Sequence, residues 1–242
     1  MEKKIYYLLT VIAFSILYFF TALIVISLIP FLFFKMKKTV IFIMRFWART
    51  VFFLIGRKLH VQGKENIKKN EKYILIANHA SLFDIAAIMS FSPGIAWFGR
   101  EKLTRIPLFG KVLELTDYIP MKSTSYKHTK AMIQELTEKS KEHTIAIFPE
   151  GTRTLTGKIN DFYRGFIILL RFSEIDVLPV TLNGFYKLKT KNRFYIGFNS
   201  RLDVIIHNPI PRIELVNKKD SEIIDIIKNR IESALVQQVR QI

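Results

Sequence analysis

The pattern of apolar and polar positions divides the chain into two parts. Residues 5–34 contain no charged side chain, and this run exceeds the roughly 20 residues that a helix needs to cross a bilayer. Pro30 is expected to kink or end this helix. The run is longer than a signal-peptide core and no clear cleavage site follows it, so we expect it to be retained.

A second apolar stretch covers residues 39–56 and carries Arg45 and Arg49 on one helical face beside aromatic side chains. Such a helix suits the membrane interface, with its guanidinium groups at headgroup level. We therefore predict a membrane-embedded two-helix element over residues 1–58. Its placement stays open: the first helix spans the bilayer, which its length favours, or both helices form a hairpin in one leaflet. A hairpin buried in a soluble core is the least favoured alternative.

From residue 59 onward, short apolar runs bounded by turn residues alternate with helical patterns. Strands are predicted at 73–77, 95–98, 144–148 and 176–182, and helices at 81–90, 127–141 and 221–239. Residues 194–198 and 202–206 are expected to pair as a hairpin around Asn199 and Ser200. Alternation of strands and helices predicts one α/β domain over residues 59–242, with a mostly parallel sheet flanked by helices.

Charge and composition narrow the range of partners. The formal net charge is +17, and residues 1–60 contain nine basic residues against one acid. Basic residues beside bulk hydrophobicity point to a membrane surface rather than to nucleic acid, which we do not expect as a partner. The chain has no cysteine, which excludes disulfides and thiolate nucleophiles. None of its five histidines lies at metal-ligand spacing from His79, so we expect neither a metal nor another cofactor.

The first candidate site is His79, which directly follows the predicted strand 73–77. Sheets of this class place ligands at the carboxyl ends of their strands. Asp84 lies five residues further on and can orient the imidazole and stabilise its protonated form, which makes His79 a candidate general base. An alternative is structural: Ser81 and Asp84 have nearly the spacing of a capping box, which would commit Asp84 to the helix start.

The second candidate site follows the predicted strand 144–148. Gly151 lets the backbone approach a ligand closely, and Arg153 offers a planar fork of donors that suits a phosphate. Glu150 can hold that arginine in place or accept a hydrogen bond from a glycerol hydroxyl. The alternative is a surface ion pair on a turn.

Together and in this order, these stretches resemble the lysophosphatidic acid acyltransferase family, the bacterial 1-acyl-sn-glycerol-3-phosphate acyltransferases. Residues 78–84 (NHASLFD) are similar to its His-x4-Asp motif and residues 148–154 (FPEGTRT) to its Glu-Gly-Thr-Arg motif. Weaker blocks at 99–110 and 177–180 also fit. The chain departs from the family where Met121 and Lys122 replace the usual Asp-Arg, and where Arg100 and Lys102 stand for the usual Lys and Glu.

The resemblance implies a glycerolphosphate acyltransferase-like fold and transfer of a fatty acyl group, from acyl-carrier protein or acyl-CoA, to the sn-2 hydroxyl of lysophosphatidic acid. His79 would be the base, oriented by Asp84, and a backbone N–H is expected to stabilise the oxyanion. The residues implied to hold the glycerol phosphate are Glu150, Gly151, Thr152, Arg153 and Arg100. The implied location is the inner membrane, with the active site on the cytoplasmic face and membrane lipids as partners.

Other interpretations of the sequence stay open. The acceptor could be another lysolipid or glycerol 3-phosphate. A membrane-anchored basic protein that binds anionic headgroups or nucleic acid without catalysis explains the charge and the helices, but not two motifs at strand ends; a metal hydrolase ranks lowest. The acyl chain needs an apolar slot, and the candidate aromatic residues, which more often serve as simple core, are Phe83, Trp97, Phe98 and Phe109.

Overall fold

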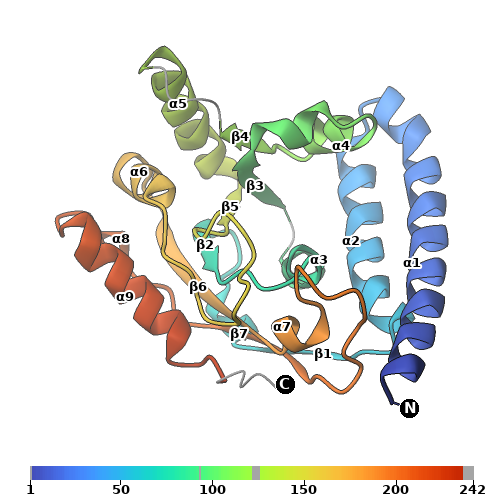
Figure 1. The fold of residues 1–242 in the computed structure, drawn as a ribbon. Helices are drawn as coiled ribbons and strands as arrows, with labels where there is room; N and C mark the ends of the chain where they lie inside the picture. Colours follow the sequence, from blue (N-terminus) through green and yellow to red (C-terminus); the bar gives the residue numbers. More distant parts are fainter. Residues whose placement is uncertain (1, 93, 122–125, 237–242) are drawn as a thin grey trace.

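The computed structural model describes residues 2–92, 94–121 and 126–236. Within them the strands form one seven-stranded sheet in the order β1-β7-β6-β2-β5-β3-β4 (Figure 1). Neighbouring strands run parallel throughout, except for the antiparallel pair β6–β7. The strands are β1 Leu59–Gln62, β2 Tyr73–Ala77, β3 Ile95–Arg100, β4 Ile119–Met121, β5 Thr144–Ile147, β6 Asp176–Asn183 and β7 Leu202–Ile206. A mostly parallel sheet flanked by helices is the predicted fold class.

The nearly uninterrupted apolar sequences of the central strands explain why they lie in the middle of the sheet. β2 (YILIA) and β5 (TIAI) are buried along their whole length, and strands covered on both faces read as continuous apolar runs. Helices cover both faces (Figure 1). The α-helices are α1 Glu2–Phe33, α2 Lys37–Leu54, α3 Phe83–Phe91, α4 Phe109–Leu115, α5 Tyr126–Glu142, α6 Gly165–Phe172, α7 Phe185–Leu188, α8 Arg212–Leu215 and α9 Asp220–Glu232; the short 3-10 helices are η1 Lys64–Asn66 and η2 Glu101–Arg105.

Two apolar cores lie on opposite faces of the sheet. One core joins the sheet to α1, α2, α3 and α7. The other joins it to α5, α6 and α9 through residues such as Leu136, Phe166 and Ile227. Because successive strand residues point to opposite faces, each of the central strands contributes to both cores. The loops that follow β2 and β5 leave from the middle of the sheet, between these two layers.

The N-terminal helices form an antiparallel hairpin along one side of the domain (Figure 1). Among the described residues, α1 alone is long and apolar enough to cross a bilayer, with a candidate span at Lys4–Phe33. Only a narrow stripe of α1, including Ala13 and Leu17, joins the core, and much of its remaining surface presents large apolar side chains to the exterior. Pro30 lies inside α1 and does not end it, since the helix continues to Phe33.

The predicted hairpin of residues 194–198 with 202–206 is wrong. β7 lies between β1 and β6, whereas residues 194–198 form an irregular segment against the first turns of α1. There Tyr6 stacks on Phe198 and Tyr7 on Phe194, and the N–H of Ile196 donates to Thr10 Oγ1 at 2.8 Å. The aromatic residues of this segment thus pack against a helix, α1, rather than pairing as a strand with β7.

Other boundaries shift by a few residues. α3 begins at Phe83 and not at the predicted residue 81, and β5 ends before Phe148. α9 ends at Glu232, and the predicted helical residues 237–239 lie outside the described residues, as does Lys122. β1 and β4, which sequence reasoning missed, are short strands at the two edges of the sheet.

Candidate active site

His79 lies on the loop between β2 and α3, at the carboxyl end of a central strand. Asn78 fixes the start of this loop, because its side chain accepts from Leu182 N at 2.8 Å and donates to Leu182 O at 3.1 Å. The loop is thereby fastened to the neighbouring strand β6. His79 therefore leaves the sheet from a defined point, as the sequence predicts for a ligand-facing residue.

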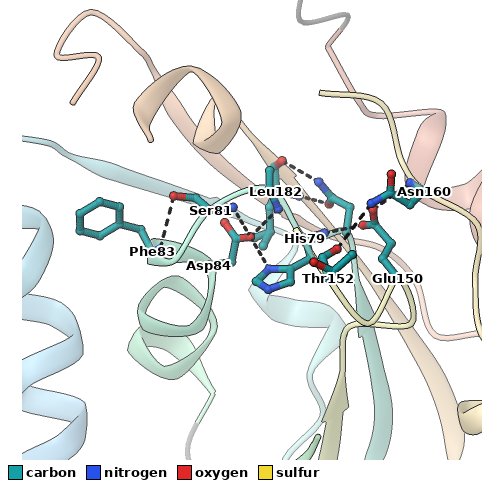
Figure 2. A network of polar contacts seen from close by, with 10 residues as sticks. His79, Ser81, Phe83, Asp84, Glu150, Thr152, Asn160 and Leu182 are labelled. Atoms are coloured by element: carbon teal, nitrogen blue, oxygen red, sulfur yellow. Dashed lines mark hydrogen bonds and ion pairs between the residues drawn. The ribbon is translucent and has the colours of Figure 1, made fainter. Parts of the chain in front are cut away.

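The imidazole of His79 and the carboxylate of Asp84 are in direct contact (Figure 2). Nδ1 of His79 lies 2.8 Å from Oδ2 of Asp84, and the two side chains are 16% and 0% exposed. Since an ionised carboxylate only accepts hydrogen bonds, Nδ1 carries the proton and the Nε2 lone pair of the neutral ring is available. In the part of the chain that the structure describes, Nε2 has no hydrogen-bond partner.

Asp84 serves the helix start as well as the histidine. Its Oδ2 accepts from the N–H groups of Ala80 and Ser81 at 2.6 and 2.8 Å, and Ser81 Oγ accepts from Phe83 N at 3.4 Å. The same carboxylate oxygen thus binds both the backbone before α3 and the imidazole, while the N-cap of α3 is Leu82 rather than the predicted Ser81. Two backbone donors hold Oδ2 in place, so the imidazole meets a pre-oriented acceptor.

An aromatic residue fixes the plane of the His79 ring. Phe148, which directly follows β5, stacks on it with centroids 4.1 Å apart and an interplanar angle of 14°, and Trp97 stacks in turn on Phe148 at 5.4 Å. Sequence reasoning gave Phe148 no role. The only available signal was its place at the end of a buried strand, and nothing in the sequence showed that β5 neighbours β2.

Glu150 connects the two motif loops, and among the described residues it forms no hydrogen bond or ion pair with Arg153. Its side chain is buried; Oε1 accepts from His79 N at 2.6 Å and Oε2 from Asn160 N at 2.8 Å (Figure 2). Burial raises the pKa of Glu150 to about 7, although both N–H bonds act in the opposite direction. The two roles that the sequence suggested for Glu150, holding the arginine or accepting from a glycerol hydroxyl, do not correspond to these contacts, because both oxygens are occupied by backbone donors.

The turn after Glu150 gathers positive charge. Gly151 has φ +61°, a conformation that favours glycine, and its carbonyl accepts from Arg100 Nη2 at 2.8 Å. Lys191 Nζ lies 3.4 Å from Thr152 Oγ1. No hydrogen bond or ion pair of the Arg153 guanidinium occurs among the described residues. The structure thus brings Arg100 and residues 150–153 together, and it adds Lys191, which the alternating cations of residues 187–193 could have suggested.

The four aromatic candidates do not line one slot. Phe83 belongs to the core on the α3 face and Phe98 to the core on the opposite face, because Trp97 and Phe98 are neighbours on a strand and point to opposite sides. Phe109 is 42% exposed at the start of α4. Within the described ranges, no group of three potential metal-ligating side chains lies together.

Comparison with known proteins gives a consistent result. The family model described as "Acyltransferase" matches residues 58–183. A 1-acyl-sn-glycerol-3-phosphate acyltransferase from Borreliella burgdorferi is 31% identical over 196 residues, 79% of this chain and 77% of that protein. The chloroplastic LPAT1 of Arabidopsis thaliana, named with the same activity, is 26% identical over 171 residues, 70% of this chain. The chain spans about half the length of the plant relatives, 48% for LPAT1.

A solved structure is similar over the full length. The crystal structure of the 1-acyl-sn-glycerophosphate acyltransferase PlsC from Thermotoga maritima has a TM-score of 0.78, 25% sequence identity, and coverage of 100% of both chains. The two motifs, the family model and these relatives all point to the same family. The chain belongs to the 1-acyl-sn-glycerol-3-phosphate acyltransferase family.

Proposed function

We propose that this protein transfers a fatty acyl group from acyl-carrier protein or acyl-CoA to the sn-2 hydroxyl of lysophosphatidic acid. The products are phosphatidic acid and the free carrier thiol. The pairing of His79 Nδ1 with Asp84 Oδ2 at 2.8 Å carries the proposal, because it leaves a basic Nε2 at the carboxyl end of the sheet, beside the turn at 150–153. The names of the relatives supply the substrate class.

In the proposed reaction His79 acts twice, first as a base and then, once protonated, as an acid. His79 Nε2 takes the proton of the sn-2 hydroxyl while its oxygen attacks the thioester carbonyl, and Asp84 stabilises the imidazolium that forms. Collapse of the tetrahedral intermediate breaks the C–S bond, and the imidazolium returns the proton to the leaving thiolate. General base catalysis of this kind contributes about 10²–10⁴-fold, so positioning of both lipids supplies much of the remaining acceleration.

The phosphate of the acceptor is assigned to the turn after β5. Arg153 supplies a planar fork of donors, and Arg100 adds a second guanidinium at the carbonyl of Gly151. Glu150 acts in this proposal as a positioning residue, since both of its oxygens hold backbone N–H groups. Thr152 stays a candidate contact through its hydroxyl.

Residues 1–58 are proposed to anchor the enzyme in the membrane, with residues 59–242 as the catalytic domain at its surface. α1 contacts the domain at both ends: Thr10 bonds to Ile196 near its start, and Leu28 packs with Val40 and Val112 near its end. A helix that is fastened to the rest of the protein near both of its ends favours insertion into one leaflet over spanning. The proposed site is the cytoplasmic face of the inner membrane, where soluble acyl donors reach the site.

Purified full-length protein in detergent micelles tests the proposal. It is given labelled acyl-CoA or acyl-carrier protein with lysophosphatidic acid, lysophosphatidylcholine or glycerol 3-phosphate. The expected result is labelled phosphatidic acid, formed fastest from lysophosphatidic acid. A clear preference for another acceptor would reassign the substrate. Binding to anionic vesicles without product from any donor would favour the non-catalytic headgroup binder.

A further inference from the structure

The loop at residues 189–200 carries three cations, and two of them are committed to the loop itself. Lys189 donates to Thr190 O at 2.9 Å and to the carbonyl of Arg193. Arg193 donates to Tyr195 O at 3.1 Å and lies 4.6 Å over the Tyr195 ring. These two side chains stabilise the loop, which leaves Lys191 as its exposed cation.

Lys191 points to the turn after β5. Its Nζ lies 3.4 Å from Thr152 Oγ1. In the sequence Thr152 stands between Gly151, whose carbonyl accepts from Arg100, and Arg153. Arg100 and Lys191, from two other parts of the chain, therefore contact the turn that itself carries Arg153. Among the described residues none of the three pairs with an acid, and Glu150 is turned away to backbone donors. Three cations at one turn, none of them neutralised by a described acid, favour a ligand with more than one negative charge.

The proximity of the loop to Arg153 has an electrostatic consequence. The pKa of Lys189 is lowered, first by burial and then by repulsion from Arg153 and Arg193. Positive charge from the loop and from the turn thus acts on the same region. A phosphate bound there would relieve this repulsion.

The position of the loop depends on α1. The N–H of Ile196 donates to Thr10 Oγ1 at 2.8 Å, and Asn199 Nδ2 donates to Tyr6 OH at 2.8 Å. The rings of Tyr7 and Phe194 stack with centroids 6.0 Å apart. The helix that is proposed to enter the membrane therefore also fixes the segment that carries Lys191.

We propose that Lys191 is a specificity-determining phosphate contact, by which the protein separates lysophosphatidic acid from acceptors without a phosphate. A lysine ammonium acts as a compact point charge with three donors, which complements the planar forks of Arg100 and Arg153. The inference rests on the proposed function, because it assigns the ligand of the same turn.

Equilibrium binding in the His79→Ala background tests this inference without turnover. Lysophosphatidic acid and 1-monoacylglycerol are titrated in neutral detergent micelles into His79→Ala and into His79→Ala with Lys191→Ala. We expect Lys191→Ala to weaken lysophosphatidic acid binding about tenfold and to leave monoacylglycerol binding unchanged. Lys191→Arg should restore most of the affinity. Lys187→Ala, an equal loss of charge at an exposed position on α7, should match the parent.

The kinetic counterpart separates this inference from the proposed function. In the otherwise unmutated enzyme, Lys191→Ala should raise the KM for lysophosphatidic acid about tenfold while kcat stays within about twofold. Equal weakening of both lipids, or an unchanged affinity for lysophosphatidic acid, would overturn the role of Lys191. Failure of the unmutated enzyme to acylate lysophosphatidic acid would instead overturn the proposed function, while the binding titration would still decide the inference.

Discussion

The side chain of Glu150 holds the backbone of His79: Oε1 accepts from His79 N at 2.6 Å, across 71 residues of sequence. The link is doubled, because Thr154 N donates to His79 O at 2.9 Å. The loop that carries the proposed base and the loop that carries the proposed phosphate site are thus one unit. Glu150 and Thr154 of the second motif therefore position the backbone of the base, in addition to the ring of Phe148 that stacks on its side chain.

Replacing Glu150 by Gln should therefore damage both stability and turnover. The amide offers one acceptor oxygen and an NH₂ group that only donates, so the NH₂ group meets a backbone N–H and leaves buried donors unsatisfied. We expect the free energy of unfolding to fall by about 1–3 kcal/mol and kcat to fall with little change in acceptor KM. Denaturant titration and steady-state kinetics measure the two effects. Glu232→Gln, an exposed site at the end of α9, serves as the control and should change neither.

The raised pKa of Glu150 should make the free energy of unfolding depend on pH. Burial raises its pKa from 4.5 to about 7, so between these pH values the folded protein holds a proton that the unfolded chain has released. The stabilisation from this proton is fully present below pH 4.5 and is lost as the pH rises through about 7. The difference in unfolding free energy between the parent and Glu150→Gln should shrink across that window. A difference that grows with pH would mean that the two N–H bonds outweigh burial.

Phe148 should matter for catalysis more than for folding. Phe148→Leu keeps an apolar side chain at the end of β5 but removes the ring that stacks on His79. An aromatic pair is worth about 0.5–1.5 kcal/mol, which corresponds to a loss of roughly two- to tenfold in kcat if the stack orients the base. Phe148→Tyr retains the ring and should retain the rate. Equal kcat for Leu and Phe at this position would show that Asp84 alone orients the imidazole.

Thr10 should couple the membrane hairpin to the 189–200 loop. Thr10→Val is nearly isosteric and removes the acceptor of the buried Ile196 N–H, which should cost about 1–3 kcal/mol of unfolding free energy. The acceptor KM should rise with it, because the loop carries Lys191. Ser27→Ala is a control on the same helix, since Ser27 donates only to its own helix, to Ile24 O. A normal KM in Thr10→Val would contradict the coupling.

Much of the fold was predictable where the pattern is local. The runs YILIA and TIAI predict β2 and β5 because strands covered on both faces are apolar throughout. The hairpin at 194–206 failed because the partner of Ile196 is Thr10, 186 residues away, and no local pattern reveals such a contact. β1 and β4 are too short for the alternation of apolar and polar residues along a strand to be recognised in the sequence.

In the candidate site, too, contacts between residues close in sequence were predictable and contacts between distant segments were not. His79 and Asp84 are five residues apart, on a loop and in the first turn of the helix that follows it, so their spacing predicts the pair. The bond of Glu150 to His79 and the stack of Phe148 depend on β2 and β5 being neighbours, which sequence alone does not establish. Lys191 lies still further away, on a loop whose place is set by a helix at the other end of the chain.

The rate of acyl transfer to lysophosphatidic acid by His79→Ala, at saturating donor and acceptor, tests the central claim most directly. We expect kcat to fall by about 10²–10⁴-fold, while the variant still unfolds in a cooperative thermal transition and binds lysophosphatidic acid as the parent does. A His79→Ala variant that keeps kcat within about threefold of the parent would contradict the assignment of His79 as the base.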